Sequence, residues 1–497
     1  MTDTHTTQCP TGPGRAARTG EQLTAYPQPT PAQVADTVRT AREAADWWAG
    51  LTAAQRKRRL LAYKHELVAA RDELATMIST EAGKPMADAM VEVMISMVHL
   101  DWAARHAGRV MRRRTVYPGL LGLNTHATVE REPYGVVAVL GPWNYPLFTP
   151  GGSIWYALAA GNAVVFKASE YTPGVAELLA RLWLRANPEH PVLQFLPGDG
   201  RVGAELIKVG VDKVAFTGST ATAKKVMAQA AESLTPVVLE CGGKDALLVA
   251  ADADLAAVAK SVAFGAFSNA GQTCAGVKRV YVVDEAADDF LGELDRELDG
   301  IRADADVAAP YGPMVLPQGP DVVADHLADA ISHGAQVRHG GEHAFHRPFV
   351  DPIVVVDAPE DSAAVSEETF GPLLVVNRVP DLPEAVQRTN ANALGLTASI
   401  WTADVAAAKQ LATRLRVSTV TINTALGFMG TPTLPFGGRG ASGFGRIHGD
   451  DGIREFSVAT SRSRLLFDLP IDVMTLRHPE GNVDRVSALV QLLHGRR

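Results

Sequence analysis

The chain has 497 residues, of which 46% are hydrophobic and 21% charged, and its formal net charge is −8. This composition is typical of a water-soluble globular protein, and the acidic balance speaks against nucleic acid or an anionic membrane surface as the main partner. Because a single hydrophobic core rarely grows beyond about 250–300 residues, we expect at least two domains.

The first segment, Met1–Gly20, is polar and lacks the apolar run of a signal peptide, so we expect a disordered tail. The sequence contains no uninterrupted apolar stretch of about 18 residues, which predicts that no segment spans a membrane. The three cysteines, Cys9, Cys241 and Cys274, are too few and odd in number for a disulfide framework. These features predict a protein of the reducing cytoplasm.

Residues 31–114 show the apolar spacing of helices, with a break at Glu81–Pro85. Residues 125–129 alternate apolar and polar side chains, as an exposed strand or arm does. Short unbroken apolar runs then alternate with helical segments, which predicts a parallel sheet buried on both faces. The runs in this first series are Val136–Leu140, Ala163–Phe166, Val214–Phe216 and Val237–Leu239.

A second series of strands and helices begins near Asp252 and predicts another α/β domain. It opens with a predicted helix at Ala253–Ala263. The predicted strands are Val277–Val283, Val354–Val356, Leu373–Val379 and Thr419–Ile422. A short amphipathic helix is predicted at Val483–Leu493.

Two residues that follow these elements could carry chemistry. Cys274 lies in a polar, glycine-containing segment after a helix, where a thiolate could attack a carbonyl carbon and form a thiohemiacetal and then a thioester. Taken alone, a single cysteine is more often a small structural residue. Glu240 ends an apolar strand, where it is either a solvated charge or, if its surroundings raise its pKa, a general base.

Seven sequence blocks, in order, resemble those of the aldehyde dehydrogenase superfamily. Phe267–Cys274 is similar to the cysteine signature of that family and Leu239–Lys244 to its glutamate signature. The separation of 34 residues (274 − 240) is also usual for the family. The other blocks are Gly141–Pro146, Phe166–Glu170, Phe216–Thr220, Glu367–Pro372 and Pro435–Gly443. The resemblance covers about residues 35–467.

The resemblance implies that the protein oxidises an aldehyde to its carboxylic acid and reduces NAD(P). Cys274 would attack the aldehyde carbon, and Asn144 with the backbone N–H of Cys274 would hold the resulting oxyanion. Glu240 would activate the water that hydrolyses the thioester. Without the other blocks, Asn144 would read as a turn residue in a loop flanked by prolines. The pocket for the aldehyde is expected around Ala425 and Met429.

The resemblance also implies a site for NAD, with NADP possible. Lys167 and Glu170 would hold the adenosine ribose. Ser219 precedes a predicted helix whose N-terminal amides suit a pyrophosphate. Glu368 would bind the nicotinamide ribose, although its block could also be a plain turn. The full set of implied cofactor-binding residues is Lys167, Glu170, Gly218, Ser219, Trp143, Glu368 and Phe370.

The implied fold is α/β, aldehyde dehydrogenase-like, with a Rossmann-type cofactor domain, an α/β catalytic domain and a β oligomerisation arm. The implied bounds are 21–114 and 134–241 for the cofactor domain, 242–450 for the catalytic domain, 115–133 and 455–470 for the arm, and 1–20 and 471–497 for the tails. The expected partners are a small-molecule aldehyde and further copies of the chain, as a homodimer or homotetramer, with no nucleic acid and no membrane.

Two patterns point to other sites and are discounted. Gly198–Gly203 spells G-x-G-x-x-G, but no acidic residue ends a strand about 20 residues later, so we do not expect the pyrophosphate there. His339, His343 and His346 flank two glycines and fit a polar surface turn better than a metal site, so no metal is expected.

Three alternatives remain open at this point. The first is an acylating dehydrogenase that passes the thioester to CoA; such enzymes usually lack the glutamate base, so Glu240 argues against it. The second is a protein that kept the fold without catalysis, but both Cys274 and Glu240 are present. The third is a cysteine–histidine hydrolase, and no histidine lies in a block that pairs convincingly with Cys274.

Overall fold

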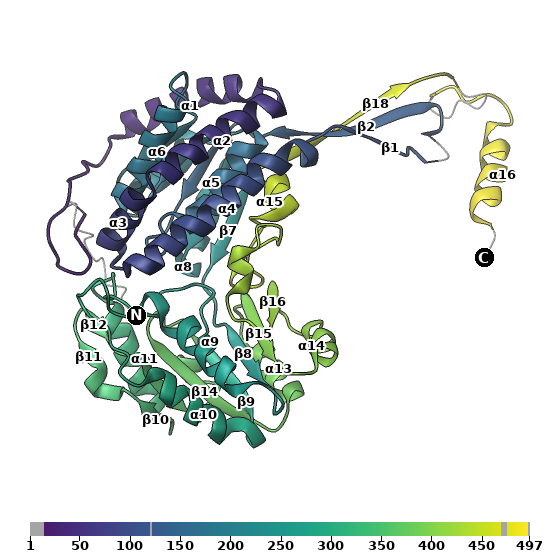
Figure 1. Ribbon diagram of the computed structural model, residues 1–497. Helices are drawn as coiled ribbons and strands as arrows, with labels where there is room; N and C mark the ends of the chain where they lie inside the picture. The colour runs from purple at the N-terminus through teal and green to yellow at the C-terminus, as the bar shows by residue number, and fades with distance from the viewer. Residues whose placement is uncertain (1–13, 120–121, 469–474, 496–497) are drawn as a thin grey trace. The chain divides into compact units, whose positions relative to one another are not determined.

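The computed structural model describes residues 14–119, 122–468 and 475–495 (Figure 1). Among these, one compact unit comprises the residues up to Val110 together with Pro133–Ser457, and a second comprises Met111–Glu132 together with the residues from Val458 onward. None of the helices described combines the length and apolar character needed to cross a bilayer.

Helices fill the first hundred residues of the large unit. The predicted break at Glu81–Pro85 is confirmed: α3 ends at Ala82, Gly83 follows with a φ of 69°, and the next helix begins at Met86. Capping boxes start the first two helices, at Thr30 and Thr52, where each threonine accepts a hydrogen bond from the backbone three residues on. The helices are α1 (Pro31–Ala49), α2 (Ala53–Ala69), α3 (Arg71–Ala82) and α4 (Met86–Val110).

The first sheet of this unit has six strands in the order β17-β7-β6-β3-β4-β5. They are β3 (Val136–Leu140), β4 (Ala163–Lys167), β5 (Leu193–Leu196), β6 (Lys213–Gly218), β7 (Val237–Cys241) and β17 (Gly443–Phe444). All neighbours are parallel except β17 against β7. The four predicted strands are confirmed. The intervening helices are α5 (Phe148–Ala160), α6 (Pro173–Ala186), α7 (Gly200–Val209) and α8 (Thr220–Ala231).

The parallel strands of this sheet bring several predicted site residues to one edge. Register pairs Leu140 of β3 with Lys167 of β4 on one side and with Phe216 of β6 on the other, and Gly218 of β6 with Cys241 of β7. Because parallel strands end at the same side of a sheet, the segments that follow these strands share one rim.

The second sheet has seven strands in the order β10-β13-β14-β9-β8-β15-β16, with only β10 antiparallel to its neighbour. They are β8 (Ala246–Val249), β9 (Arg279–Val283), β10 (Gln336–His339), β13 (Ile353–Val356), β14 (Leu373–Val379), β15 (Thr397–Trp401) and β16 (Thr419–Ile422). Its helices are α9 (Leu255–Phe267), α10 (Asp284–Leu298), α11 (Gly319–Ser332), α12 (Ala363–Ser366), α13 (Leu382–Ala391) and α14 (Val405–Ala412), and a small hairpin joins β11 (Phe345–His346) to β12 (Phe349–Val350). The helix α15 (Gly449–Glu455) instead packs against α4 and α5 beside the first sheet. The predicted second α/β series is confirmed, although β8, β10 and β15 were not predicted.

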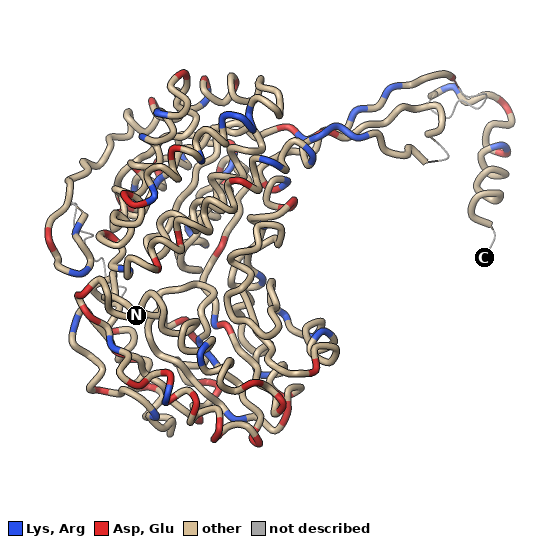
Figure 2. The backbone as a smooth tube through the Cα atoms, viewed as in Figure 1, with Lys and Arg blue, Asp and Glu red and all other residues tan. Residues whose placement is uncertain are grey.

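The smaller unit contains a three-stranded sheet in the order β1-β2-β18. Its elements are β1 (Arg114–Val116), β2 (Thr125–Pro133), β18 (Ser457–Leu465) and the helix α16 (Asn482–His494). Figure 2 shows basic residues along these strands, and one of them, Arg462, lies 2.7 Å from both Glu130 and Glu132. The predicted strand at residues 125–129 and the predicted C-terminal amphipathic helix are both found here.

Part of the predicted N-terminal tail is ordered. Residues 1–13, including Cys9, lie outside the described residues. Beyond them, Arg15 forms a β-bridge with Gln22, and Ala16 is buried. The Arg18 guanidinium donates to the carbonyl oxygens of Asp304 and Asp306 at 2.6 and 2.7 Å. The expectation of disorder therefore fails for residues 14–20, because these side chains find partners far along the chain.

Candidate active site

Cys274 lies at the end of a loop that is held in an unusual backbone conformation. After α9 the short 3-10 helix η2 (Ser268–Gly271) carries Asn269 and Ala270 with φ values of 53° and 55°. The side-chain amide of Asn269 donates to the carbonyl oxygens of Asn144 and Gln272 at 3.1 and 3.2 Å. These buried hydrogen bonds offset the cost of the left-handed backbone and fix the segment that carries the cysteine.

A buried lysine holds the other side of this loop. The Nζ of Lys278 donates to the carbonyl oxygens of Thr273 and Cys274 at 2.8 and 2.7 Å. It also lies 3.8 Å from Oε1 of Glu368. The Lys278 ammonium, directly before β9, therefore holds both the backbone of the loop that carries Cys274 and the Glu368 carboxylate.

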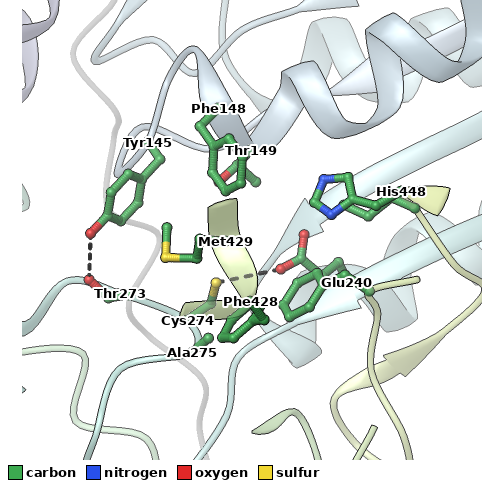
Figure 3. Close-up of a pocket in the computed structure, with 12 residues that line it drawn as sticks. Tyr145, Phe148, Thr149, Glu240, Thr273, Cys274, Ala275, Phe428, Met429 and His448 are labelled. Carbon is green, nitrogen blue, oxygen red and sulfur yellow. Dashed lines mark hydrogen bonds between the residues drawn. The ribbon is translucent and has the colours of Figure 1, made fainter. Parts of the chain in front are cut away.

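Glu240 lies directly against the cysteine. Its Oε1 is 3.5 Å from Sγ of Cys274, and its Oε2 accepts a hydrogen bond of 3.1 Å from the Thr217 hydroxyl (Figure 3). The residue is 4% exposed. Burial raises the pKa of the Glu240 carboxyl to about 7, and the hydrogen bonds from Cys274 and Thr217 only partly oppose this rise. A carboxyl in this range can accept a proton near neutral pH.

The Cys274 thiol is protonated in its resting surroundings. Its burial, and then the charge of Glu240, raise the pKa of the thiol well above its ordinary value, and Lys278 opposes them. Although these surroundings have a low dielectric constant, Cys274 remains partly accessible through two cavities that it lines. The thiol therefore needs a neighbouring base before it can attack a carbonyl.

The first cavity, of about 330 Å³, brings together most of the predicted cofactor and oxyanion residues. Its lining includes Trp143, Asn144, Gly218, Ser219, Cys274, Glu368 and Phe370. Asn144 donates through Nδ2 to the carbonyl oxygen of Gln272 at 3.0 Å, so its side-chain amide is fixed beside the cysteine loop. The rings of Trp143 and Phe370 meet edge to face at 5.6 Å.

Two features of this cavity suit different parts of a ligand, a helix N-terminus for an anionic group and a carboxylate for hydroxyl groups. Ser219 is the N-cap of α8 and accepts a hydrogen bond from the Thr222 N–H, so the first turn of a twelve-residue helix opens beside it. At Gly242 a Cβ atom would lie 1.7 Å from Oε2 of Glu368, so only glycine lets that carboxylate reach the cavity. Glu368 in turn accepts a hydrogen bond of 3.1 Å from the Gly243 N–H.

Lys167 and Glu170 are the two predicted cofactor-binding residues that do not line this cavity. Lys167 ends β4, and its Nζ lies 3.8 Å from Oε2 of Glu170. Because β4 is parallel to its neighbour β3, both residues still lie at the rim of the sheet that carries Asn144 and Ser219.

The second cavity lies on the other side of Cys274 and contains residues that the sequence did not reveal. Met429 lines it as expected, whereas Ala425 is buried and is not part of the wall. His448 also lines it, and Nε2 of this 4% exposed residue has no hydrogen-bond partner among the described residues. Local sequence around Ile447-His448-Gly449 gives no functional signal, so only the fold places this histidine near the cysteine (Figure 3).

The discounted glycine and histidine patterns lie at the start of a helix and in or before a small hairpin. Gly200 of the G-x-G-x-x-G stretch starts α7, which Asp199 caps. Nε2 of His346 lies 3.0 Å from a carboxylate oxygen of Asp351. Within the described part of the chain, no group of three or more histidine, cysteine or acidic residues is arranged to hold a metal.

Residues 10–461 match the model of the Aldehyde dehydrogenase family. The chain belongs to this family. The resemblance expected from the sequence is thereby confirmed over nearly the whole chain, and the catalytic and cofactor blocks all fall within the matched range.

Named relatives of this aldehyde dehydrogenase differ in what they act on. It is 38% identical over 452 residues to 4,4'-diapolycopene aldehyde oxidase of Methylomonas sp, covering 90% of this chain and 85% of the relative. It is 34% identical over 456 residues to a putative succinate-semialdehyde dehydrogenase, marked NADP(+), of Mycobacterium ulcerans, covering 89% of this chain and 87% of the relative.

Solved structures confirm the fold. An NAD-dependent aldehyde dehydrogenase from Sinorhizobium meliloti superposes with a TM-score of 0.88 at 31% identity, covering 93% of this chain and 92% of that one. An NADP-dependent enzyme from E. coli superposes with a TM-score of 0.87 at 31% identity, covering 91% and 94%. The α/β fold that the sequence predicted is thus the fold of this family.

Proposed function

We propose that this protein oxidises an aldehyde to the carboxylic acid with reduction of NAD(P), using Cys274 as nucleophile and Glu240 as general base. The observation that carries the proposal is the distance of 3.5 Å between Sγ of Cys274 and Oε1 of Glu240. It is supported by the position of Cys274, which lines both an apolar cavity and the cavity that holds Ser219 and Glu368.

In the first step Glu240 takes the thiol proton, and the Cys274 thiolate attacks the carbonyl carbon. A C–S bond forms, and the carbonyl π electrons move to oxygen. The Asn144 side-chain amide and the backbone N–H of Cys274 donate to this oxyanion. The amide is already oriented by its hydrogen bond to the Gln272 carbonyl oxygen, so it reorganises little as charge develops.

NAD(P) held by the residues of the cavity that Ser219 and Glu368 line would supply the hydride acceptor, and loss of the hydride would convert the thiohemiacetal on Cys274 into a thioester. Glu240 then releases the thiol proton to solvent, water attacks the thioester carbon, and Glu240 accepts the water proton. The C–S bond breaks, the acid leaves, and the sulfur departs as a thiolate that takes the proton back from Glu240. Thr217 holds the Glu240 carboxylate through its second oxygen during these proton transfers.

The cofactor fits the residues present. The helix N-terminus at Ser219 would hold the pyrophosphate, and Lys167 with Glu170 the adenosine ribose. Glu368 would hold the nicotinamide ribose, and the glycine at position 242 leaves the space that this carboxylate occupies. We propose NAD as the default cofactor because the Glu170 carboxylate opposes a 2′-phosphate. NADP stays acceptable because the Lys167 ammonium, 3.8 Å from the Glu170 carboxylate, would offer a cation to that phosphate.

Comparisons support this cofactor proposal. Indole-3-acetaldehyde dehydrogenase AldA of P. syringae, 31% identical to this chain, has been solved with NAD+. The mycobacterial relatives are named as NADP(+) enzymes. Phe370 would flank the nicotinamide and Trp143 would line the adenosine-phosphate side, and their rings meet edge to face between these two parts of the site.

The decisive test follows absorbance at the reduced-nicotinamide band with a panel of aldehydes, with and without CoA. Turnover without CoA that disappears in Cys274→Ala supports the proposal, and Cys9→Ala serves as the matched cysteine control. Turnover that requires CoA would instead indicate the acylating reaction. Absence of turnover with every aldehyde and both cofactors would argue for a protein without catalysis.

We also propose that the β1-β2-β18 sheet is an oligomerisation arm of a homodimer or homotetramer. Leu465, Leu466 and Phe467 at its end are 58%, 50% and 56% exposed, an apolar surface that a second copy would cover.

The cytoplasm is the proposed compartment, because Cys241 and Cys274 are both free thiols. We further propose a cofactor domain at residues 21–114 and 134–241 and a catalytic domain at residues 242–450.

A further inference from the structure

The cavity on the far side of Cys274 from Ser219 is walled mainly by apolar and aromatic side chains (Figure 3). They include Tyr145, Phe148, Phe428, Met429, Phe436 and Ile447. No lysine or arginine lines this cavity. Its histidine, His448, is uncharged, because burial and the nearby His99 hold its pKa well below the ordinary value. A substrate group that enters here therefore meets no cation.

A third cavity, of about 210 Å³, adjoins this inner cavity and is called the outer cavity. The two share Tyr145 and Met429 as lining residues, so these two side chains stand between them. The outer cavity is also lined by Val91 and Phe264, which are 49% and 57% exposed, and it therefore opens at the surface. Together the two cavities form an apolar path from solvent to Cys274.

The charges on the outer cavity oppose an anionic substrate. Lys84 is its only lining cation, and its Nζ lies 2.5 Å from Oε2 of Glu92 and 3.4 Å from the centre of the Tyr145 ring. Both side chains of the ion pair are 1% exposed. Asp88 lines the same cavity. Two carboxylates thus face one ammonium that is already paired, and a substrate carboxylate would enter a net negative, poorly hydrated path.

Met429 is suited to control passage between the cavities. It lies on the short 3-10 helix η4 (Gly427–Gly430), and its carbonyl oxygen is 2.9 Å from Nε2 of His99, which fixes its backbone. In Figure 3 its thioether lies between Tyr145 and Cys274. An unbranched side chain on a fixed backbone can change rotamer to admit a chain.

Resting on the proposed aldehyde oxidation, we infer that the substrate is an uncharged aldehyde with an extended apolar chain, and that Met429 is a specificity-determining residue at the junction of the two cavities. An aldehyde with a second, ionised carboxylate is disfavoured, although several relatives are named for succinate semialdehyde. The chain of the substrate would lie past Met429 and Tyr145 toward Val91 and Phe264.

The first experiment compares kcat/KM for propanal, decanal and succinate semialdehyde. Since each buried methylene adds to binding, decanal should exceed propanal by ~10-fold or more, and it should exceed succinate semialdehyde by ~100-fold. Succinate semialdehyde equal to or better than decanal would overturn the inference while leaving the proposed function intact. Oxidation of none of the three would overturn the proposed function itself.

Substitutions at Val91 and Met429 test whether the substrate chain occupies the inner and outer cavities. Val91→Lys places a cation at the mouth and should raise the kcat/KM ratio of succinate semialdehyde to decanal by ~3-fold or more. Val98→Lys, on the same helix and 42% exposed, does not line the cavity and should leave the ratio unchanged. Met429→Trp should lower the decanal-to-propanal ratio by ~10-fold. Equal ratios in Val91→Lys and Val98→Lys would overturn the assigned path, even if Met429→Trp does not fold.

Discussion

Sγ of Cys274 and Oε1 of Glu240 lie 3.5 Å apart although 34 residues separate them in the chain. The pairing arises because Glu240 ends a strand of the first sheet, while Cys274 lies in the loop between α9 and β9 of the second. The two halves of the reaction centre are thus supplied by two different sheets. The activity of the protein should therefore depend on this contact and on the side chains that surround it.

Glu240→Gln should slow both steps of the reaction, because Glu240 is proposed to take first the thiol proton and later the water proton. The amide keeps the shape of the side chain but cannot accept a proton, so steady-state turnover should fall by ~100-fold or more. Stopped-flow absorbance would follow the first turnover, in which reduced nicotinamide forms before thioester hydrolysis. Steady-state turnover close to that of the wild type would contradict the role of Glu240.

The pH dependence of the wild type should report the same carboxyl. Because burial raises the pKa of Glu240 to about 7, its basic form is scarce below that pH. kcat/KM should therefore climb about tenfold per pH unit on the acid side and level off above about pH 7. In Glu240→Gln this limb should be lost. A wild-type inflection at the ordinary glutamate pKa would show that the carboxyl is not perturbed as described.

Gly242→Ala tests the space beside the cofactor cavity. The added Cβ would fall 1.7 Å from Oε2 of Glu368, so the carboxylate must move. KM for the nicotinamide cofactor should rise by ~10- to 100-fold. Titration of cofactor against tryptophan fluorescence gives an independent measure of binding. Gly292→Ala is a suitable control, since open space surrounds that position. An unchanged cofactor affinity in Gly242→Ala would argue against a binding role for Glu368.

Lys84→Met should destabilise the protein far more than loss of a surface ion pair. It leaves the Glu92 carboxylate buried without its cation, which costs about 3–5 kcal/mol. Lys208→Ala removes an exposed pair with Glu205 and should cost about 0–1 kcal/mol. Urea unfolding of both variants compares the two losses. Equal midpoints would show that Lys84 contributes no more than the surface lysine.

The exposed apolar end of the β1-β2-β18 sheet predicts that the protein forms a homodimer or homotetramer. Leu465→Glu combined with Phe467→Glu places two charges on the exposed apolar end of the β1-β2-β18 sheet and should shift the protein toward the monomer. Light scattering coupled to size exclusion reads the mass directly. A wild-type monomer at working concentration would already refute the proposed oligomer.

The sequence was most informative where strands are buried on both faces. Val136–Leu140 and Leu373–Val379 were predicted with the bounds observed, because such strands read as apolar runs. Thr419–Ile422 was also predicted with its observed bounds, although it is only partly buried. β15 (Thr397–Trp401) was missed because it contains buried polar residues. Thr397 bonds to the Asp245 carboxylate and Ser399 to the Thr424 carbonyl oxygen, partners that no local pattern reveals.

The same limit applies to the site. Cys274, Glu240 and Asn144 lie in blocks with recognisable order and spacing, so they could be predicted. His448 could not, because its place in the cavity depends on contact with α5, where a Cβ at Gly152 would come within 2.8 Å of its Nε2. A close approach between segments so far apart in the chain leaves no trace in either local sequence.

The pairing of β17 with β7 also sets an order on folding. Gly443 lies opposite Glu240 in register although it is 203 residues further along the chain (443 − 240), so the strand that closes the sheet edge beside the glutamate comes from a distant segment. At Gly443 a side chain would strike the Leu239 carbonyl oxygen, so the two backbones fit together only in this arrangement. Because a pairing between such distant residues requires closure of a long loop, we expect β17 to dock on β7 late in folding, so that the surroundings of Glu240 are complete only then.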